Sequence, residues 1–117
     1  MDITALASAA RTTTTNSGDL TNYDGRGLHV VVDVTSAGTG SITITIQGKD
    51  AVSGQYYTLL AGAAVTTVST NVYKVYPGLT ASANAVASDI LPRTFRILST
   101  HNNANSITYS CGCSVIR

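Results

Sequence analysis

The strongest structural signal in the chain is Ser41-Ile42-Thr43-Ile44-Thr45-Ile46-Gln47. Its isoleucines share one parity and its polar side chains share the other, which is the pattern of a strand with one buried and one exposed face. The same period of two runs through Leu28-His29-Val30-Val31-Val32-Asp33-Val34-Thr35. A turn-rich segment at 36–40 separates the two stretches. The sequence therefore predicts that they pair as an antiparallel hairpin.

Further short strands follow along the chain. The patterns predict strands at 55–61, 68–76, 94–100 and 106–116. Pro77-Gly78 ends the second of these, and the strand at 55–61 continues the meander. The Ala-rich segment 79–91 has no clear period, so we expect a strand only in its last residues. The final two strands, joined by an Asn-rich loop at 102–105, are predicted to form a C-terminal hairpin.

These signals define a fold class. About seven or eight short strands with frequent turns, and no segment with a period of 3.6 residues, predict an all-β fold. We expect a single antiparallel β-sandwich or jelly roll over residues 27–117. The first 26 residues carry little apolar surface. We expect residues 1–26 to be an extended N-terminal arm that becomes ordered against a neighbouring chain or against the domain surface.

The charge balance excludes some classes of partner. The chain has 117 residues, with 7 Lys plus Arg against 6 acidic residues and a net charge of +1. This balance supplies no field that would attract nucleic acid or an anionic membrane, so we expect neither as a partner. Only 11% of the residues are charged while 44% are hydrophobic. A surface this poor in charge predicts coverage by partner chains.

The sequence also lacks the patterns that are typical of secretory signals and membrane spans. The apolar stretch Ile3–Ala10 follows Asp2 and precedes the first basic residue, Arg11, which is the wrong arrangement for a secretory signal. No stretch approaches the roughly 18 uninterrupted apolar residues of a membrane span. We therefore expect synthesis in the cytoplasm of the cell that makes the protein.

No catalytic constellation is evident. The chain has no Glu, and most of its Asp residues fall in turn-like stretches. His29 and Asp33 share a parity on one predicted strand, but four residues of extended chain separate them by roughly 13 Å. A general base and its orienting carboxylate need direct contact. We expect no enzyme activity, no cofactor and no metal site.

The two cysteines leave two roles open. Cys111 and Cys113 are two residues apart in the last predicted strand, so both point to the same face. Extended backbone separates their Cα atoms by about 6.5 to 7 Å with parallel Cβ directions, which disfavours a bond between them. They are either a pair of small buried thiols or partners in disulfides to another chain.

Several stretches carry a resemblance to a known class of proteins. They are Gly48–Ala63, Val75-Tyr76-Pro77-Gly78, Leu91–Thr94 and Ser106–Ser110. These stretches resemble small structural proteins encoded in the virion gene clusters of tailed bacteriophages and prophages, and the similarity covers most of the chain from about Arg11 onward. No catalytic motif accompanies the resemblance. It implies a virion component, and small β-sandwich virion proteins frequently serve as capsid decoration or cement subunits, often as trimers.

The implied role is mechanical. A decoration protein binds the outer capsid surface and stabilises the expanded head, so its partners are the major capsid protein and copies of itself. The contacts of the expected arm would come from Thr12, Thr13, Thr14, Thr15, Leu20 and Tyr23, and the candidates for subunit packing on the sandwich faces are Val31, Thr43 and Thr45. A tail or neck protein that connects head and tail is the alternative. A host-surface or glycan-binding module is a further one.

Overall fold

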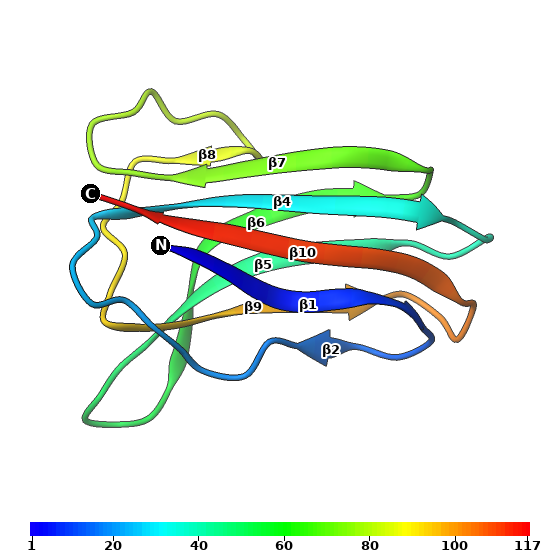
Figure 1. The fold of residues 1–117 in the computed structure, drawn as a ribbon, viewed down its shortest axis with the longest axis horizontal. Helices are drawn as coiled ribbons and strands as arrows, with labels where there is room; N and C mark the ends of the chain where they lie inside the picture. The colour runs from blue at the N-terminus through cyan, green and yellow to red at the C-terminus, as the bar shows by residue number, and fades with distance from the viewer.

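Two β-sheets packed face to face contain all the strands of the computed structural model, which describes residues 1–117 (Figure 1). The strands in chain order are β1 (Asp2–Arg11), β2 (Thr15–Asn16), β3 (Leu20–Thr21), β4 (Gly27–Ser36), β5 (Ile42–Lys49), β6 (Tyr56–Val65), β7 (Ser69–Val75), β8 (Val86–Ala87), β9 (Thr94–His101) and β10 (Ile107–Ile116). There is no helix, so the predicted all-β class is confirmed.

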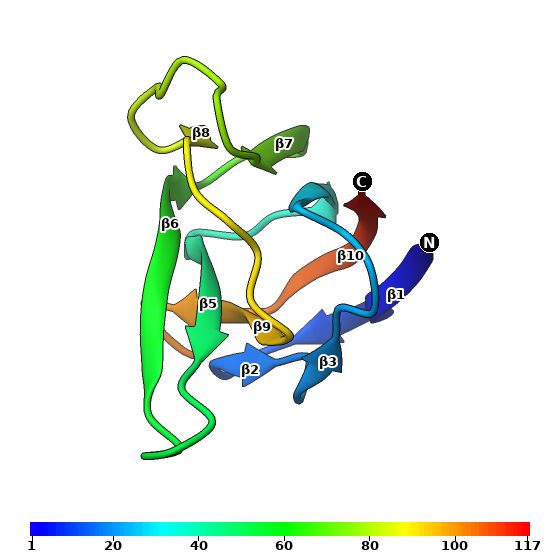
Figure 2. The ribbon, with the colours of Figure 1, turned by 90° about the vertical axis from the view of Figure 1, so that its left-hand side faces the viewer.

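The sheets have a nested order of strands. Sheet A has the order β1-β10-β4-β7-β8, and sheet B has the order β2-β9-β5-β6 with β3 also paired to β9. The long pairs are β1 with β10, β10 with β4, β4 with β7, β9 with β5 and β5 with β6, and all are antiparallel; only the short β7–β8 pair is parallel. The chain is thus a long antiparallel ribbon rolled into two layers, which is a jelly-roll arrangement (Figure 2).

Two of the predicted hairpins are wrong. β4 lies in sheet A and β5 in sheet B, and the same is true of β10 and β9. The short connections at 37–41 and 102–106 therefore cross from one layer to the other. Alternation fixes which face of a strand is buried, but it does not say whether the next strand pairs beside it or packs opposite it. The hairpin of β5 with β6 is present as expected.

The segment predicted as an N-terminal arm is ordered against the chain's own sheets. Residues 1–26 supply β1, β2 and β3, and all three pair within the same chain. β1 runs along β10 from Asp2 opposite Ser114 to Arg11 opposite Ile107. Backbone hydrogen bonds to β10, together with the buried side chain of Leu6, order a segment whose sequence has little apolar surface. Of the two surfaces expected to order it, the structure shows the domain's own.

The core lies between the sheets and follows the predicted parities. Sheet A contributes Leu28, Val30, Val32 and Val34, and sheet B contributes Ile42, Ile44 and Ile46, each at most 1% exposed. The Ala-rich segment 79–91 is mostly loop; its one short strand, β8, lies at Val86–Ala87 and not in the last residues as expected. Burying one face of each sheet leaves the other face of each to solvent or to partners.

A substitution in β1 tests whether the N-terminal segment belongs to the core. Leu6→Ala removes a side chain that is 7% exposed, and we expect the free energy of unfolding to fall by about 2 to 3 kcal/mol. Ser8→Ala, on an exposed position of the same strand, is the matched control and should change it by less than about 0.5 kcal/mol. Urea denaturation measures both. Equal, small effects would mean that β1 does not pack against the core in solution.

Candidate interaction surfaces

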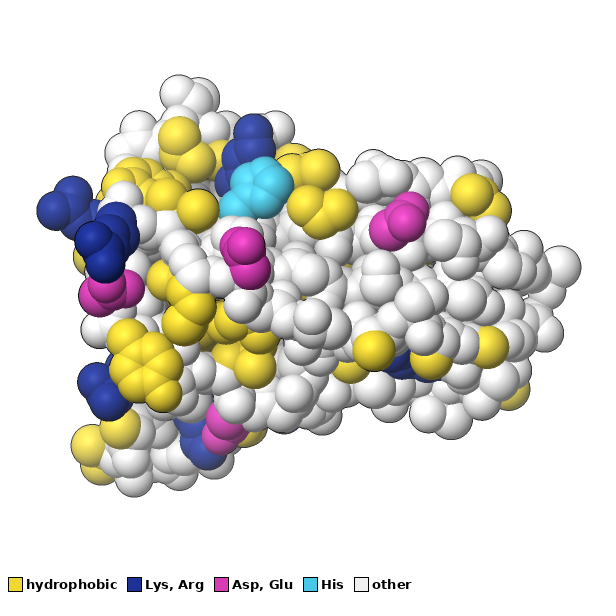
Figure 3. Space-filling view, in the orientation of Figure 1, with side chains coloured by type: hydrophobic (Ala, Val, Ile, Leu, Met, Phe, Trp, Pro, Cys, Tyr) yellow, Lys and Arg dark blue, Asp and Glu magenta, His cyan; other side chains and the backbone are white.

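Four loops meet at one end of the sandwich, and none of them carries a charge. They are the segments 12–14, 37–41, 66–68 and 102–106, composed of Thr, Ser, Asn, Gly, Ala and Val. We call this surface the uncharged end; it lies on the right in Figure 1. In Figure 3 the charged side chains gather toward the opposite end, where both chain termini lie.

Hydrogen bonds brace the loops of the uncharged end. The N–H of Ser41 donates to Asn102 Oδ1 at 2.7 Å, and the N–H of Asn102 donates to the Ser41 carbonyl at 3.2 Å. Asn105 Nδ2 donates to Thr39 Oγ1 at 2.5 Å. The N–H of His101 donates to Thr14 Oγ1 at 3.1 Å, which ties the first loop to the others. The surface is therefore held in shape before any partner binds.

The opposite end carries a cluster of charged and aromatic side chains, formed by Asp19, Lys49, Tyr56 and Arg96. We call this surface the charged end. Lys49 Nζ lies 2.8 Å from Asp19 Oδ2, and the Tyr56 hydroxyl donates to Asp19 Oδ1 at 2.5 Å. The hydrogen bond from Lys49 is the main reason that the pKa of Asp19 is lowered, with a second contribution from Tyr56. Arg96 stacks over the Tyr56 ring with 3.5 Å between Cζ and the ring centroid. Sequence analysis did not identify this cluster, because its members come from four separate segments.

The residues that the sequence predicts to contact partners do not form one surface in the structure. Thr12, Thr13, Thr14 and Thr15 lie at or beside the uncharged end, where three other loops join them. Leu20 is half-buried in β3, and Tyr23 is 71% exposed, both toward the charged end. The candidates for subunit packing are also divided, with Val31 on the outer face of sheet A and Thr43 and Thr45 on the outer face of sheet B.

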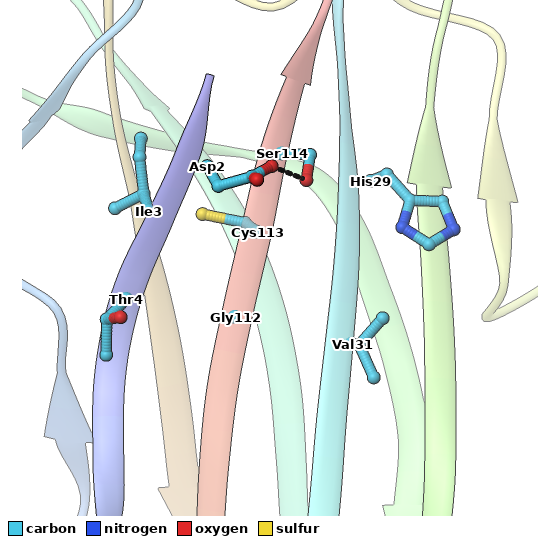
Figure 4. Close-up of a pocket in the computed structure, with 8 residues that line it drawn as sticks. All are labelled: Asp2, Ile3, Thr4, His29, Val31, Gly112, Cys113 and Ser114. Atoms are coloured by element: carbon cyan, nitrogen blue, oxygen red, sulfur yellow. Dashed lines mark hydrogen bonds between the residues drawn. The ribbon is translucent and has the colours of Figure 1, made fainter.

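The outer face of sheet A holds a shallow groove of about 370 Å³ with polar residues along it (Figure 4). Ser114 Oγ donates to Asp2 Oδ1 at 2.6 Å, while the His29 ring points away from both. His29 and Asp33 occupy the outer face of β4 and no hydrogen bond joins them. The chain has no cluster of three or more His, Cys, Asp or Glu side chains placed to hold a metal ion. It also has no helix able to cross a membrane.

A buried polar cluster connects the two sheets near the uncharged end. The Tyr109 hydroxyl donates to Ser99 Oγ at 2.8 Å and lies 2.9 Å from His101 Nε2. Arg11 covers the Tyr109 ring at 4.7 Å and donates to the Tyr109 carbonyl at 2.7 Å. Burial, and secondarily the Arg11 charge, lowers the pKa of His101, which favours the neutral form of the ring. Only the tertiary fold brings these residues together.

Both cysteines face the core. Cys111 and Cys113 are 1% and 5% exposed, and neither forms a disulfide. Burial raises the pKa of Cys111 to about 12 and that of Cys113 to about 11, which keeps both thiols protonated. Of the two roles left open by the sequence, this geometry favours buried thiols. A bond to another chain would require β10 to move out of the sandwich.

No protein-family model, no curated protein and no solved structure matches this chain. The molecule is therefore characterised by its own geometry. It is a jelly-roll sandwich with one uncharged end, one charged end and a sealed core, and its titratable groups do not converge in a cleft.

The burial of the cysteines predicts slow thiol chemistry. In the native protein we expect iodoacetamide to leave Cys111 and Cys113 unmodified under conditions that fully alkylate both in urea, because the reactive thiolate is neither formed nor exposed. Mass spectrometry of the intact chain counts the alkylated sites. Rapid native modification of either cysteine would contradict the closed sandwich.

The lowered pKa of His101 predicts a pH dependence of stability. The unfolded chain takes up a proton on this ring as the pH falls through the ordinary histidine pKa, near 6.5, while the folded chain resists protonation. The free energy of unfolding should therefore decrease as the pH is lowered from about 7.5 to 5.5. Urea midpoints at the two pH values measure it. His101→Gln should flatten this dependence, and an unchanged slope would show that His101 is not its source.

Proposed function

We propose that this chain is a structural protein of a tailed-bacteriophage virion, made in the host cytoplasm, and that it serves as a capsid decoration or cement protein. It binds the outer surface of the major capsid protein, associates with copies of itself and stabilises the expanded head. The proposal extends the resemblance in the sequence, and the uncharged end is the structural observation that supports it.

The uncharged end suits a surface that is covered by protein. Covering a charged side chain removes its hydration and demands a paired partner, whereas Thr, Ser and Asn can exchange water for hydrogen bonds with a neighbour. The cores of protein interfaces are accordingly depleted of charged residues. In a chain with charges toward its opposite end, four neutral loops side by side support the proposal that a partner covers this end.

A rigid sandwich also suits a clamp. The bonds of Ser41, Asn102 and Asn105 hold the loops before binding, so little conformational entropy is lost when the surface docks. A protein that binds only the expanded capsid adds its binding free energy to that state and shifts the equilibrium toward it. Jelly rolls are common in viral capsid and lectin domains, although this is an analogy of fold alone.

Two other functions make different demands on the same surfaces. A neck or tail connector would also use a neutral interface, but in a single ring. A glycan-binding module would use an exposed aromatic side chain, and Tyr23, 71% exposed in a loop of the charged end, is the side chain that favours this second function. Loss of glycan-array binding in Tyr23→Ala would support it.

Cryo-electron microscopy of the virion that encodes this chain tests the proposal. We expect density for the sandwich at many equivalent positions on the outer capsid lattice, with the uncharged end against the capsid. A single ring at the neck or tail would replace the decoration function with the connector function. Complete absence from purified virions would overturn a virion role.

A pair of variants tests which end docks. Thr13→Lys places a charge on an exposed position of the uncharged end, and Val52→Lys places the same charge on a side chain that is 96% exposed at the other end. We expect Thr13→Lys to weaken binding to expanded capsids that lack the protein by tenfold or more, about 1.4 kcal/mol. Val52→Lys should bind as the unchanged protein does. The reverse result would place the docking surface at the charged end.

A further inference from the structure

The edge of sheet A at β7 is only partly covered. β7 pairs with β4 from Ser69 to Val75 on one side, but on the other side β8 pairs only with Lys74 and Val75. The N–H groups of Lys74 and Tyr76 point to this outer side, where they donate to the carbonyls of Ala85 at 2.9 Å and Ala87 at 3.1 Å. Because the direction alternates along a strand, the N–H and C=O groups of Thr70 and Val72 point the same way. No strand covers them.

A groove of about 470 Å³ lies along this uncovered stretch. One wall is β7, and the other comes from the end of β6 and the loop that follows it, with Asn84 and Ala85 at the margin. No charged residue lines it. Edge strands of soluble proteins are normally protected by charge, proline or a cover, since an open edge invites another strand to pair. The missing protection indicates that a strand covers this edge in the assembled state.

The opposite edge of the same sheet offers such a strand. The Met1 carbonyl accepts from the N–H of Val115 at 2.9 Å, so Met1 and Ile3 point toward β10 and the backbone groups of Asp2 and Thr4 point outward. The far half of β1 is protected, because its register is irregular and Arg11 donates to the carbonyls of Ala7 and Ala9. The open part of β1 is therefore its first few residues.

We propose that the start of β1 from a second copy of this chain pairs with the open edge of β7 and extends sheet A from one copy into the next. The successive antiparallel pairs of sheet A make β1 and β7 run in opposite directions, so continuing the sheet brings them together antiparallel. Asp2 opposite Val72 and Thr4 opposite Thr70 is the register that satisfies the open backbone groups on both strands.

Charge complementarity supports this register. The side chains of Asp2 and Lys74 are both exposed on the outer face of sheet A. With Asp2 opposite Val72, Lys74 is the diagonal neighbour of Asp2 across the new pair, a distance that long side chains can span.

The contact joins two different edges of the sheet, so it is head-to-tail. It forms a closed ring or an open filament, depending on the rotation between successive copies. It refines the self-association included in the proposed function.

Analytical ultracentrifugation of the purified protein over a range of concentrations tests the contact without any capsid. We expect reversible association of the unchanged chain. Asp2→Lys and Lys74→Asp should each weaken it by several-fold, and combining both substitutions in one chain should restore much of the loss. Val52→Lys is the control, since Val52 is 96% exposed in the turn between β5 and β6 and lies on neither edge of sheet A. It should leave association unchanged.

Hydrogen exchange reports the edge directly and does not depend on any variant. The amides of Thr70 and Val72 should become protected as the concentration rises, while those of Asn71 and Tyr73, which face β4, should be protected throughout. A chain that stays monomeric would overturn the proposed contact, whatever the virion shows. Association that leaves Thr70 and Val72 exchanging freely, or that Val52→Lys abolishes, would overturn it in favour of a different interface.

Discussion

The packing of the apolar face of β4 against that of β5 is the constraint on which the rest of the structure depends. Burial alternates along both strands, so each has one buried apolar face, and the short connection at 37–41 lets these faces meet across the core. Once the two strands lie in opposite sheets, β7 pairs with β4, β6 pairs with β5, and the outer strands continue the same nesting. The jelly roll follows from placing two consecutive strands opposite each other.

The sequence predicts the strands of this fold better than it predicts their partners. Strand positions and buried faces depend on a local period of two, which Ile42, Ile44 and Ile46 display fully. Pairing depends on contacts distant in the sequence, such as Asp2 with Ser114, and no local pattern encodes them. β1 was missed as part of the sandwich because an edge strand needs few apolar side chains. Among the candidate site residues, Thr12 to Thr15 were identified by composition, but the loops beside them became evident only in the structure.

The few charges of the chain have a spatial order that composition does not show. Arg11 lies half-buried at the edge of sheet A, where it stacks over the Tyr109 ring and donates to backbone carbonyls. At the charged end, Lys49 forms an ion pair with Asp19, and Arg96 stacks over the Tyr56 ring, whose hydroxyl donates to Asp19. The loops of the uncharged end, in contrast, carry only neutral side chains. This polarity gives a chain with a net charge of only +1 two chemically different ends.

The two proposed contacts use perpendicular directions of the sandwich and share only the loop 66–68, which belongs to the uncharged end and also lines the groove beside β7. The uncharged end lies where the strands terminate, whereas the edges at β1 and β7 lie along the sides of sheet A. A copy docked by its loops therefore keeps both edges free for its neighbours. Because the loops of each copy are braced from within the chain, lateral pairing adds contacts without having to reshape the docking surface. Each lateral contact then holds a neighbouring copy at high local concentration over the surface that it binds, so weak individual contacts combine into strong attachment.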